Sequence, residues 1–178
     1  MSTLPFVQIP PYPSTYTAGT VLGRIVDSLG FRYHWATSDL SVGDLSFSLS
    51  ESSRSVEETL VHIYHLVMMV QTACAGGRMD MPATDPGYSF ADLRLHTLNK
   101  IQEVSTYLKE ESDKAIEGQS IRFNVRGKEY DYPFWNAING PISDSLYHVG
   151  QIVALRRANG NPMDPNVRVF LGKKVDNR

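Results

Sequence analysis

The chain has 178 residues, a net charge of −2 and 42% hydrophobic residues. Its length is most simply that of one domain, spanning 1–178, with a substantial core. The nearly neutral charge excludes a general electrostatic attraction to nucleic acid or an anionic membrane, and no apolar run approaches the roughly 20 residues that cross a bilayer. The only cysteine, Cys74, excludes an internal disulfide framework. It fits a reducing, cytoplasmic compartment.

The first part of the chain predicts an extended lead followed by a helix. Residues 1–16 carry four prolines, which favour an extended segment on the surface. From about Thr17 to Thr37, apolar residues recur at helical spacing and predict a first helix. The serine-rich, acidic segment 38–55 is typical of a loop.

The second predicted helix has a clear start and stop. Ser55 and Glu58 form a capping-box pattern, and Gly76-Gly77 is a plausible C-terminal stop. At about 100° per residue, His62 falls at the edge of the apolar face, whereas His65 falls on the opposite side. We therefore expect His62 to reach a seam between helices.

The remaining elements are two helices separated by a short β excursion. Residues 78–88 are expected to form a loop, 89–117 a third helix, and the alternating pattern of 121–132 a hairpin or extended excursion. The fourth helix extends to Asn159-Gly160, with a possible bend at Gly140-Pro141, and 163–178 form a C-terminal tail containing one brief strand. Four amphipathic helices predict an all-α fold, a four-helix bundle.

The last helix carries a polar stripe in an apolar surrounding. Asp144, His148 and Gln151 share one narrow stripe of a helix that is otherwise mostly apolar. A carboxylate and an imidazole one turn apart on a buried helix need a partner, which can be each other, a backbone group or a metal ion.

Two interpretations of this stripe stay open on spacing alone. In the first, His62 joins Asp144 and His148 to hold a divalent transition metal such as Zn or Ni, and open coordination positions remain for water or substrate. Such an ion would lower the pKa of a bound water or thiol. In the second, Asp144 and His148 form a hydrogen-bonded i, i+4 pair and His62 is unrelated. The spacing by itself favours the second interpretation.

Three segments carry a resemblance to a known family. They are FRYHWATSDL, SVEETLVHIYHL and NGPISDSLYHVGQIVALRRANGNP, and together they reach from the first helix to the end of the last. They resemble the DinB-like family of four-helix-bundle metalloproteins, which includes bacterial thiol transferases. The resemblance implies a metal site at His62, Asp144 and His148. The family pattern has histidine where this chain has Asp144, a residue that can ligate the same ions.

Several further residues have two possible roles. Gln151 can orient a ligand or make a helix-packing contact, and Tyr33 can line the mouth of a pocket or belong to the core. His34 and His65 are substitute ligands or surface histidines. Cys74 is expected to be a small core residue rather than a nucleophile.

Two functions follow from these observations. The resemblance implies a metal-dependent enzyme that transfers or hydrolyses a small molecule, with a low-molecular-weight thiol as a possible substrate, and it implies a homodimer. The alternative is a non-catalytic helical bundle that binds a ligand or a partner, with a vacant metal site. Neither function involves nucleic acid or a membrane.

Overall fold

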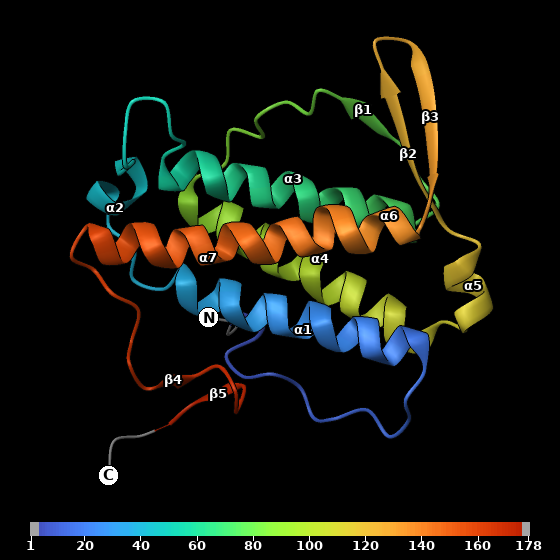
Figure 1. Cartoon of the computed structure of the whole chain (residues 1–178), viewed down its shortest axis with the longest axis horizontal. Helices are drawn as coiled ribbons and strands as arrows, with labels where there is room; N and C mark the ends of the chain where they lie inside the picture. Colours follow the sequence, from blue (N-terminus) through green and yellow to red (C-terminus); the bar gives the residue numbers. More distant parts are fainter. Residues whose placement is uncertain (1–3, 176–178) are drawn as a thin grey trace.

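Four long helices form the body of the molecule (Figure 1). The computed structural model describes residues 4–175. The long helices are α1 (Ala18–Ala36), α3 (Val56–Cys74), α4 (Phe90–Glu110) and α7 (Ser143–Ala158). Helix α1 packs on α4 and α7, and α3 packs on the same two helices. The expected mostly helical fold is thus confirmed, and the apolar faces of these helices form a common core.

The predicted starts of the first two long helices are confirmed by their caps. The Thr17 and Ser55 side chains each accept a hydrogen bond from the backbone three residues later. In α3 the backbone N–H of Ser55 also donates to Glu58 Oε2 at 2.7 Å, which completes the expected capping box. Because the orphan backbone donors are satisfied locally, the helices start where the sequence indicates.

Three segments differ from expectation. The segment 38–55 is not all loop, because its own capping residue, Ser41, starts the short helix α2 (Val42–Ser46). The helix expected over 89–117 ends at Glu110, and Ser112 caps a separate short helix, α5 (Asp113–Glu117). Segment 78–88 contains the strand β1 (Met79–Met81), whose pairing partner lies more than forty residues away in the sequence.

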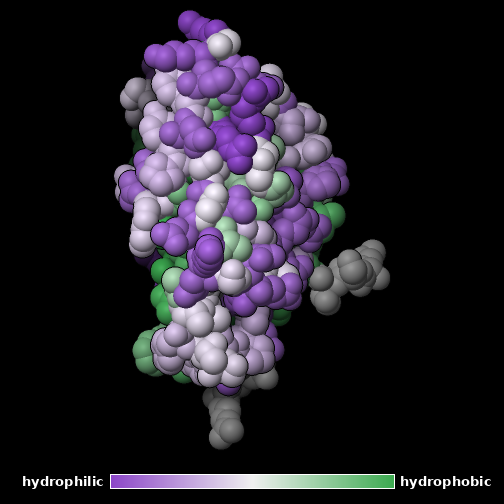
Figure 2. Space-filling model, turned by 90° about the vertical axis from the view of Figure 1, so that its right-hand side faces the viewer, coloured by the Kyte–Doolittle hydropathy of each residue, from purple (hydrophilic) through white to green (hydrophobic). Residues whose placement is uncertain are grey.

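The expected β excursion is a hairpin. Strands β2 (Ser120–Val125) and β3 (Lys128–Pro133) are antiparallel, and β1 adds to β2 in parallel, giving the order β1-β2-β3. Arg126 and Gly127 turn the chain with positive φ angles of 52° and 83°, the geometry of a tight hairpin turn. Strand β2 contacts α3. Figure 2 views this end of the molecule, whose surface is mainly hydrophilic with small apolar patches.

The approach to α7 is kinked rather than continuous. After α6 (Trp135–Ala137), one π-helical turn, η1 (Ile138–Ile142), contains Gly140 with non-helical angles of −94° and −111°. Beyond this turn, regular α-helix resumes at Ser143 as α7. The bend lies at the expected Gly140-Pro141 step, because proline cannot continue the helical hydrogen bonds.

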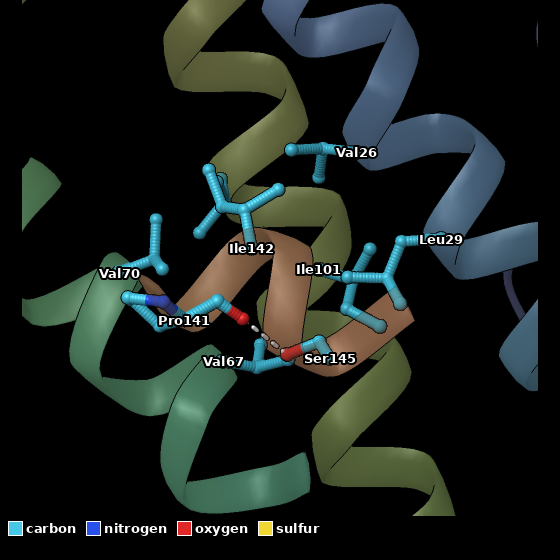
Figure 3. A pocket seen from close by; sticks show the side chains of 9 residues that line it. Val26, Leu29, Val67, Val70, Ile101, Pro141, Ile142 and Ser145 are labelled. Atoms are coloured by element: carbon cyan, nitrogen blue, oxygen red, sulfur yellow. Dashed lines mark hydrogen bonds between the residues drawn. The ribbon is translucent and has the colours of Figure 1, made fainter. Parts of the chain in front are cut away.

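A serine repairs the hydrogen bonding beside this kink. The Ser145 hydroxyl donates to the carbonyl of Pro141 at 2.6 Å, next to a small apolar cavity of about 10 Å³ (Figure 3). The cavity has room for about one water at most. It is a packing imperfection in the core and not a ligand site.

The two ends of the described chain meet over α1. Phe6 of the N-terminal lead is buried and packs where Gly30 leaves room. The backbone N–H of Ile9 donates to the Gly172 carbonyl at 2.8 Å, beside the short strands β4 (Val167–Arg168) and β5 (Lys173–Lys174). The lead is therefore tied down at Phe6 and Ile9. Met1 to Thr3 and the last three residues of the predicted tail lie outside the described part.

Two arginines hold the C-terminal end of α1. Arg94 of α4 donates to the His34 carbonyl at 2.9 Å, and Arg156 of α7 donates to the Ala36 carbonyl at 2.9 Å. Arg156 is buried and also donates to the Asn161 carbonyl at 2.7 Å. The guanidinium of Arg156 therefore joins α7 to the C-terminal end of α1.

Among residues 4–175, no helix is both long enough and apolar enough to cross a membrane.

Candidate metal centre

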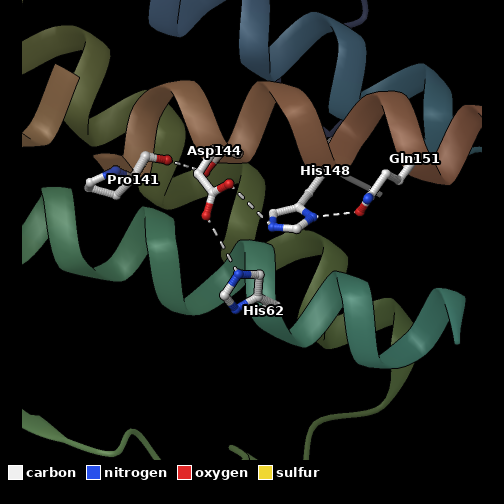
Figure 4. A network of polar contacts seen from close by, with 6 residues as sticks. His62, Pro141, Asp144, His148 and Gln151 are labelled. Atoms are coloured by element: carbon white, nitrogen blue, oxygen red, sulfur yellow. Dashed lines mark hydrogen bonds and ion pairs between the residues drawn. The ribbon is translucent and has the colours of Figure 1, made fainter. Parts of the chain in front are cut away.

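His62, Asp144 and His148 lie together on the facing sides of α3 and α7 (Figure 4). His62 Nε2 is 3.7 Å from Asp144 Oδ2, and His148 Nε2 is 3.5 Å from Asp144 Oδ1. The two imidazole rings meet edge-on, with centroids 4.6 Å apart. One ligand atom from each residue lies within 4.8 Å of the others. The expected convergence of two distant segments is present.

Helix geometry accounts for this cluster. Asp144 and His148 are one turn apart on α7 and so project from the same side of the helix. His62 belongs to α3, which packs against both α7 and the π-helical turn before it. The register of two long helices, rather than a loop, therefore sets the position of each side chain.

Gln151 determines which nitrogen of His148 faces the cluster. The Nδ1–H of His148 donates to Gln151 Oε1 at 2.6 Å. In a neutral imidazole the other nitrogen, Nε2, is then an acceptor. A carboxylate is also an acceptor, so the Nε2 lone pair of His148 and Asp144 Oδ1 face each other across 3.5 Å. Such a pair of acceptors is favourable only with a cation between or beside them.

The distances suit a metal better than direct hydrogen bonds. Hydrogen bonds between nitrogen and oxygen are about 2.7–3.2 Å long, shorter than the 3.5 and 3.7 Å from Asp144 to His148 and His62. Ligands of a tetrahedral zinc ion, bound at about 2.0–2.1 Å, stand roughly 3.3 Å apart. Two imidazoles and one carboxylate also form a donor set that suits Zn or Ni.

The cluster is open on one side. The His148 side chain is 9% exposed, whereas those of His62 and Asp144 are 30% and 44% exposed. Burial, and to a smaller extent the positive charge of Arg54, lowers the pKa of His62 below its ordinary value of 6.5. His62 is therefore neutral near pH 7 and available as a ligand. A small molecule can approach the cluster from solvent.

Other candidate residues lie elsewhere. Tyr33 is fully buried in the core, where burial raises its pKa to about 12, so it does not line a pocket mouth. His34 is also buried, not on the surface, and its Nδ1–H donates to the Pro5 carbonyl at 2.8 Å. His65 donates to the Thr84 carbonyl at 3.0 Å. Neither histidine belongs to the cluster.

Cys74 lies in the core, as expected. It is buried, and burial raises the pKa of its thiol to about 12. A thiol with so high a pKa is almost fully protonated at neutral pH and is a poor nucleophile. Any thiol chemistry at this site must therefore use a thiol from the substrate.

Arg54 was missed at the level of the sequence. Its positive charge acts on both Glu58 and His62, so it lies beside the opening of the cluster. Arg54, Glu58 and His62 are spaced four residues apart, which within a helix would place them on one face. Arg54 precedes the cap of α3, however, so helical spacing does not predict its position.

Comparison with solved structures identifies the fold. The crystal structure of a DinB-like protein, YjoA, from Bacillus subtilis matches 80% of this chain and 96% of its own chain, with a TM-score of 0.56 and 14% identity. The chain has the DinB-like fold. No family model and no curated protein matches the sequence. At 14% identity, this likeness concerns the fold alone.

Proposed function

We propose that this chain is a DinB-like four-helix bundle that binds one divalent transition metal, Zn or Ni, through His62, Asp144 and His148. We further propose that it is a metal-dependent enzyme for a small molecule, with thiol transfer or hydrolysis as the reaction. The observation that carries the proposal is the pair of acceptors, His148 Nε2 and Asp144 Oδ1, which Gln151 holds facing each other.

Each residue has a defined task in this proposal. His62 and His148 supply neutral nitrogens from two helices, and Asp144 supplies a negative charge that offsets part of the ion's charge. Gln151 keeps His148 in the tautomer that presents Nε2. When bound, the metal supplies Lewis acidity, which makes a water or thiol nucleophilic near neutral pH. The exposed sides of His62 and Asp144 leave room for that molecule.

A thiol is proposed as a substrate because the sequence resembles that of thiol transferases. The chain's own cysteine, Cys74, is buried, so the reacting thiol would belong to the substrate. The alternative, a non-catalytic bundle with a vacant site, requires that the three side chains serve stability alone. We propose, in addition, that the chain is a single domain that acts as a cytoplasmic homodimer.

The decisive experiment is elemental analysis of the protein purified without added metal. We expect close to one equivalent of Zn or Ni in the unaltered protein and in His96→Ala, a control that removes a histidine outside the cluster. His148→Ala is expected to lose the metal while keeping its helical circular dichroism. A metal-free protein that also fails to take up added Zn or Ni would support the non-catalytic alternative.

A further inference from the structure

A second hollow lies beside α3, between this helix and the small sheet. It has a volume of about 600 Å³ and is lined by Met69 of α3, by strand residues, and by the hairpin turn. The other lining residues are Met81, Pro82, Phe123, Val125 and Arg126. Pockets of this size commonly hold small molecules. We refer to it as the hairpin groove.

The lining of the hairpin groove is apolar apart from one charge. Met81 and Val125 are paired across β1 and β2, so the two strands form a continuous apolar wall opposite Met69. Thioether side chains are flexible and polarizable, and they adapt to ligands of different shape. The wall can therefore bind the apolar part of small molecules that differ in shape.

Arg126 is the single cation of the groove. Among residues 4–175, no hydrogen bond or ion pair joins its side chain to another residue. By contrast, Arg78, beside the same sheet, is paired with Glu129 at 2.8 Å. An unpaired guanidinium at the edge of an apolar groove attracts a carboxylate, sulfonate or phosphate group.

The backbone at Arg126 also departs from what a turn prefers. Its φ of 52° is left-handed, a conformation that glycine, asparagine and aspartate tolerate far better than arginine. Asparagine is the common choice at this turn position. The structure thus keeps an arginine where local folding favours another residue, and that arginine lines the groove.

The groove and the metal centre share one stripe of α3. Met69 follows His62 by seven residues, which is two turns, or about 10 Å along the axis. The hairpin groove therefore lies about two helical turns from His62, on the same side of α3.

We propose that the hairpin groove binds a small amphiphile that has an apolar body and one anionic group, with the anion on Arg126. If the metal centre is catalytic, the hairpin groove would select amphiphiles of this kind as its substrates. This part of the inference rests on the proposed function.

Methionine-methyl NMR of the full-length, metal-free protein tests the groove directly, with decanoate as the probe. We expect saturable shifts of the Met69 and Met81 methyl signals and none at Met163, which does not line the groove. Met163 follows the C-terminal end of α7 in the sequence, and that end of α7 lies on the opposite side of the molecule from the hairpin (Figure 1). In Arg126→Gln, the affinity for decanoate should fall about tenfold, because a charge-assisted contact is lost. Binding of the neutral analogue decanol should not change.

Arg122→Gln, on the same hairpin, is the matched control and should bind decanoate as the unaltered protein does. Decanoate shifts that do not saturate, or that affect Met163 equally, would overturn the groove as a binding site. Equal affinities of Arg126→Gln and the unaltered protein would overturn its preference for anions.

The link to the metal centre has a separate readout. If Co²⁺ binds at the three ligands, it should broaden the signals of groove-bound decanoate, and it should not do so in His148→Ala. Bound Co²⁺ without this broadening would overturn the link. If Co²⁺ does not bind, the proposed function fails, while the metal-free titration still decides whether the groove binds apolar anions.

Discussion

Gln151 is the residue on which the chemistry of His148 depends, because its amide oxygen accepts the Nδ1–H at 2.6 Å. Without that acceptor, His148 can adopt the other tautomer or rotate, and Nε2 is no longer held toward Asp144. In the proposed metal site, this amide would orient a ligand without touching the ion.

We expect Gln151→Leu to weaken zinc binding by about 10- to 100-fold, the usual cost of removing a residue that orients a ligand. A competition titration with a chromogenic chelator measures this. Gln151→Glu, which keeps an acceptor at the same distance, should retain most of the affinity. Equal zinc affinity in Gln151→Leu and the unaltered protein would show that this contact does not orient His148.

His34 gives the protein a dependence on pH that is independent of the metal centre. Burial and the charge of Arg94 lower the pKa of His34 below 6.5, although its hydrogen bond to Pro5 acts in the opposite direction. Below pH 6.5 the unfolded chain therefore takes up a proton at this residue more readily than the folded chain does. Stability contributed by the neutral imidazole is fully present above pH 6.5 and is lost as the pH falls below it.

His34→Gln should flatten this dependence. We expect the free energy of unfolding, measured in urea, to fall between pH 8 and pH 5 by less in His34→Gln than in the unaltered protein. Comparing how steeply the free energy of unfolding changes with pH in the two proteins removes any loss of stability that the substitution causes at every pH. An identical slope in the two proteins would contradict the role of His34.

At the scale of elements, the ends of α1 and α7 are joined by a buried polar network. Arg156 connects the carbonyls at the end of α1 to Asn161, and Asp44 accepts from Asn159 and Asn161 at 2.8 Å. Burial alone would raise the pKa of Asp44, but its hydrogen bonds from Asn159, Ser41 and Asn161 outweigh burial and hold this pKa well below the usual range. Asp44 thus stays ionised within the network.

Neighbouring arginines allow a matched test of the network. Arg156→Leu leaves helix carbonyls and Asp44 without a cationic partner, and we expect a loss of about 2–4 kcal/mol in the free energy of unfolding. Arg157 is exposed, so Arg157→Leu should change stability by no more than about 0.5 kcal/mol. Chemical denaturation of both variants provides the comparison, and equal losses would exclude a special role for Arg156.

At the scale of the whole molecule, the proposed metal centre would bridge α3 and α7, because His62 and Asp144 lie more than eighty positions apart in the sequence. An ion that binds only the folded chain stabilises the complete arrangement, since the unfolded chain cannot keep the three ligands together.

Metal removal should therefore lower the melting temperature. With free zinc at about 100 times its dissociation constant, we expect roughly 2.7 kcal/mol of added stability. Calorimetry with excess zinc and with a chelator measures the difference. In His62→Ala the two melting temperatures should coincide, and a zinc effect that persists there would place the stabilising ion at another site.

Much of the fold could be predicted because its determinants are local. The cap at Ser55, the stop at Asn159-Gly160 and the bend at Gly140-Pro141 act through neighbouring atoms, and each lies where the sequence indicated it. The short helices and β1 were missed because they are brief. The strand β1 exists through its pairing with β2, a contact that no local pattern reveals.

The sequence by itself determined the candidate ligands, since an aspartate and a histidine one turn apart on an apolar helix require a partner. Only the tertiary structure decided that His62 lies beside Asp144 and His148, that Tyr33 is core, and that Arg156 joins helices. The physical reason is distance: helical spacing relates residues within one element, whereas packing alone sets the relation between α3 and α7. The hairpin groove, built from a helix, a strand pair and a turn, has no sequence signal for the same reason.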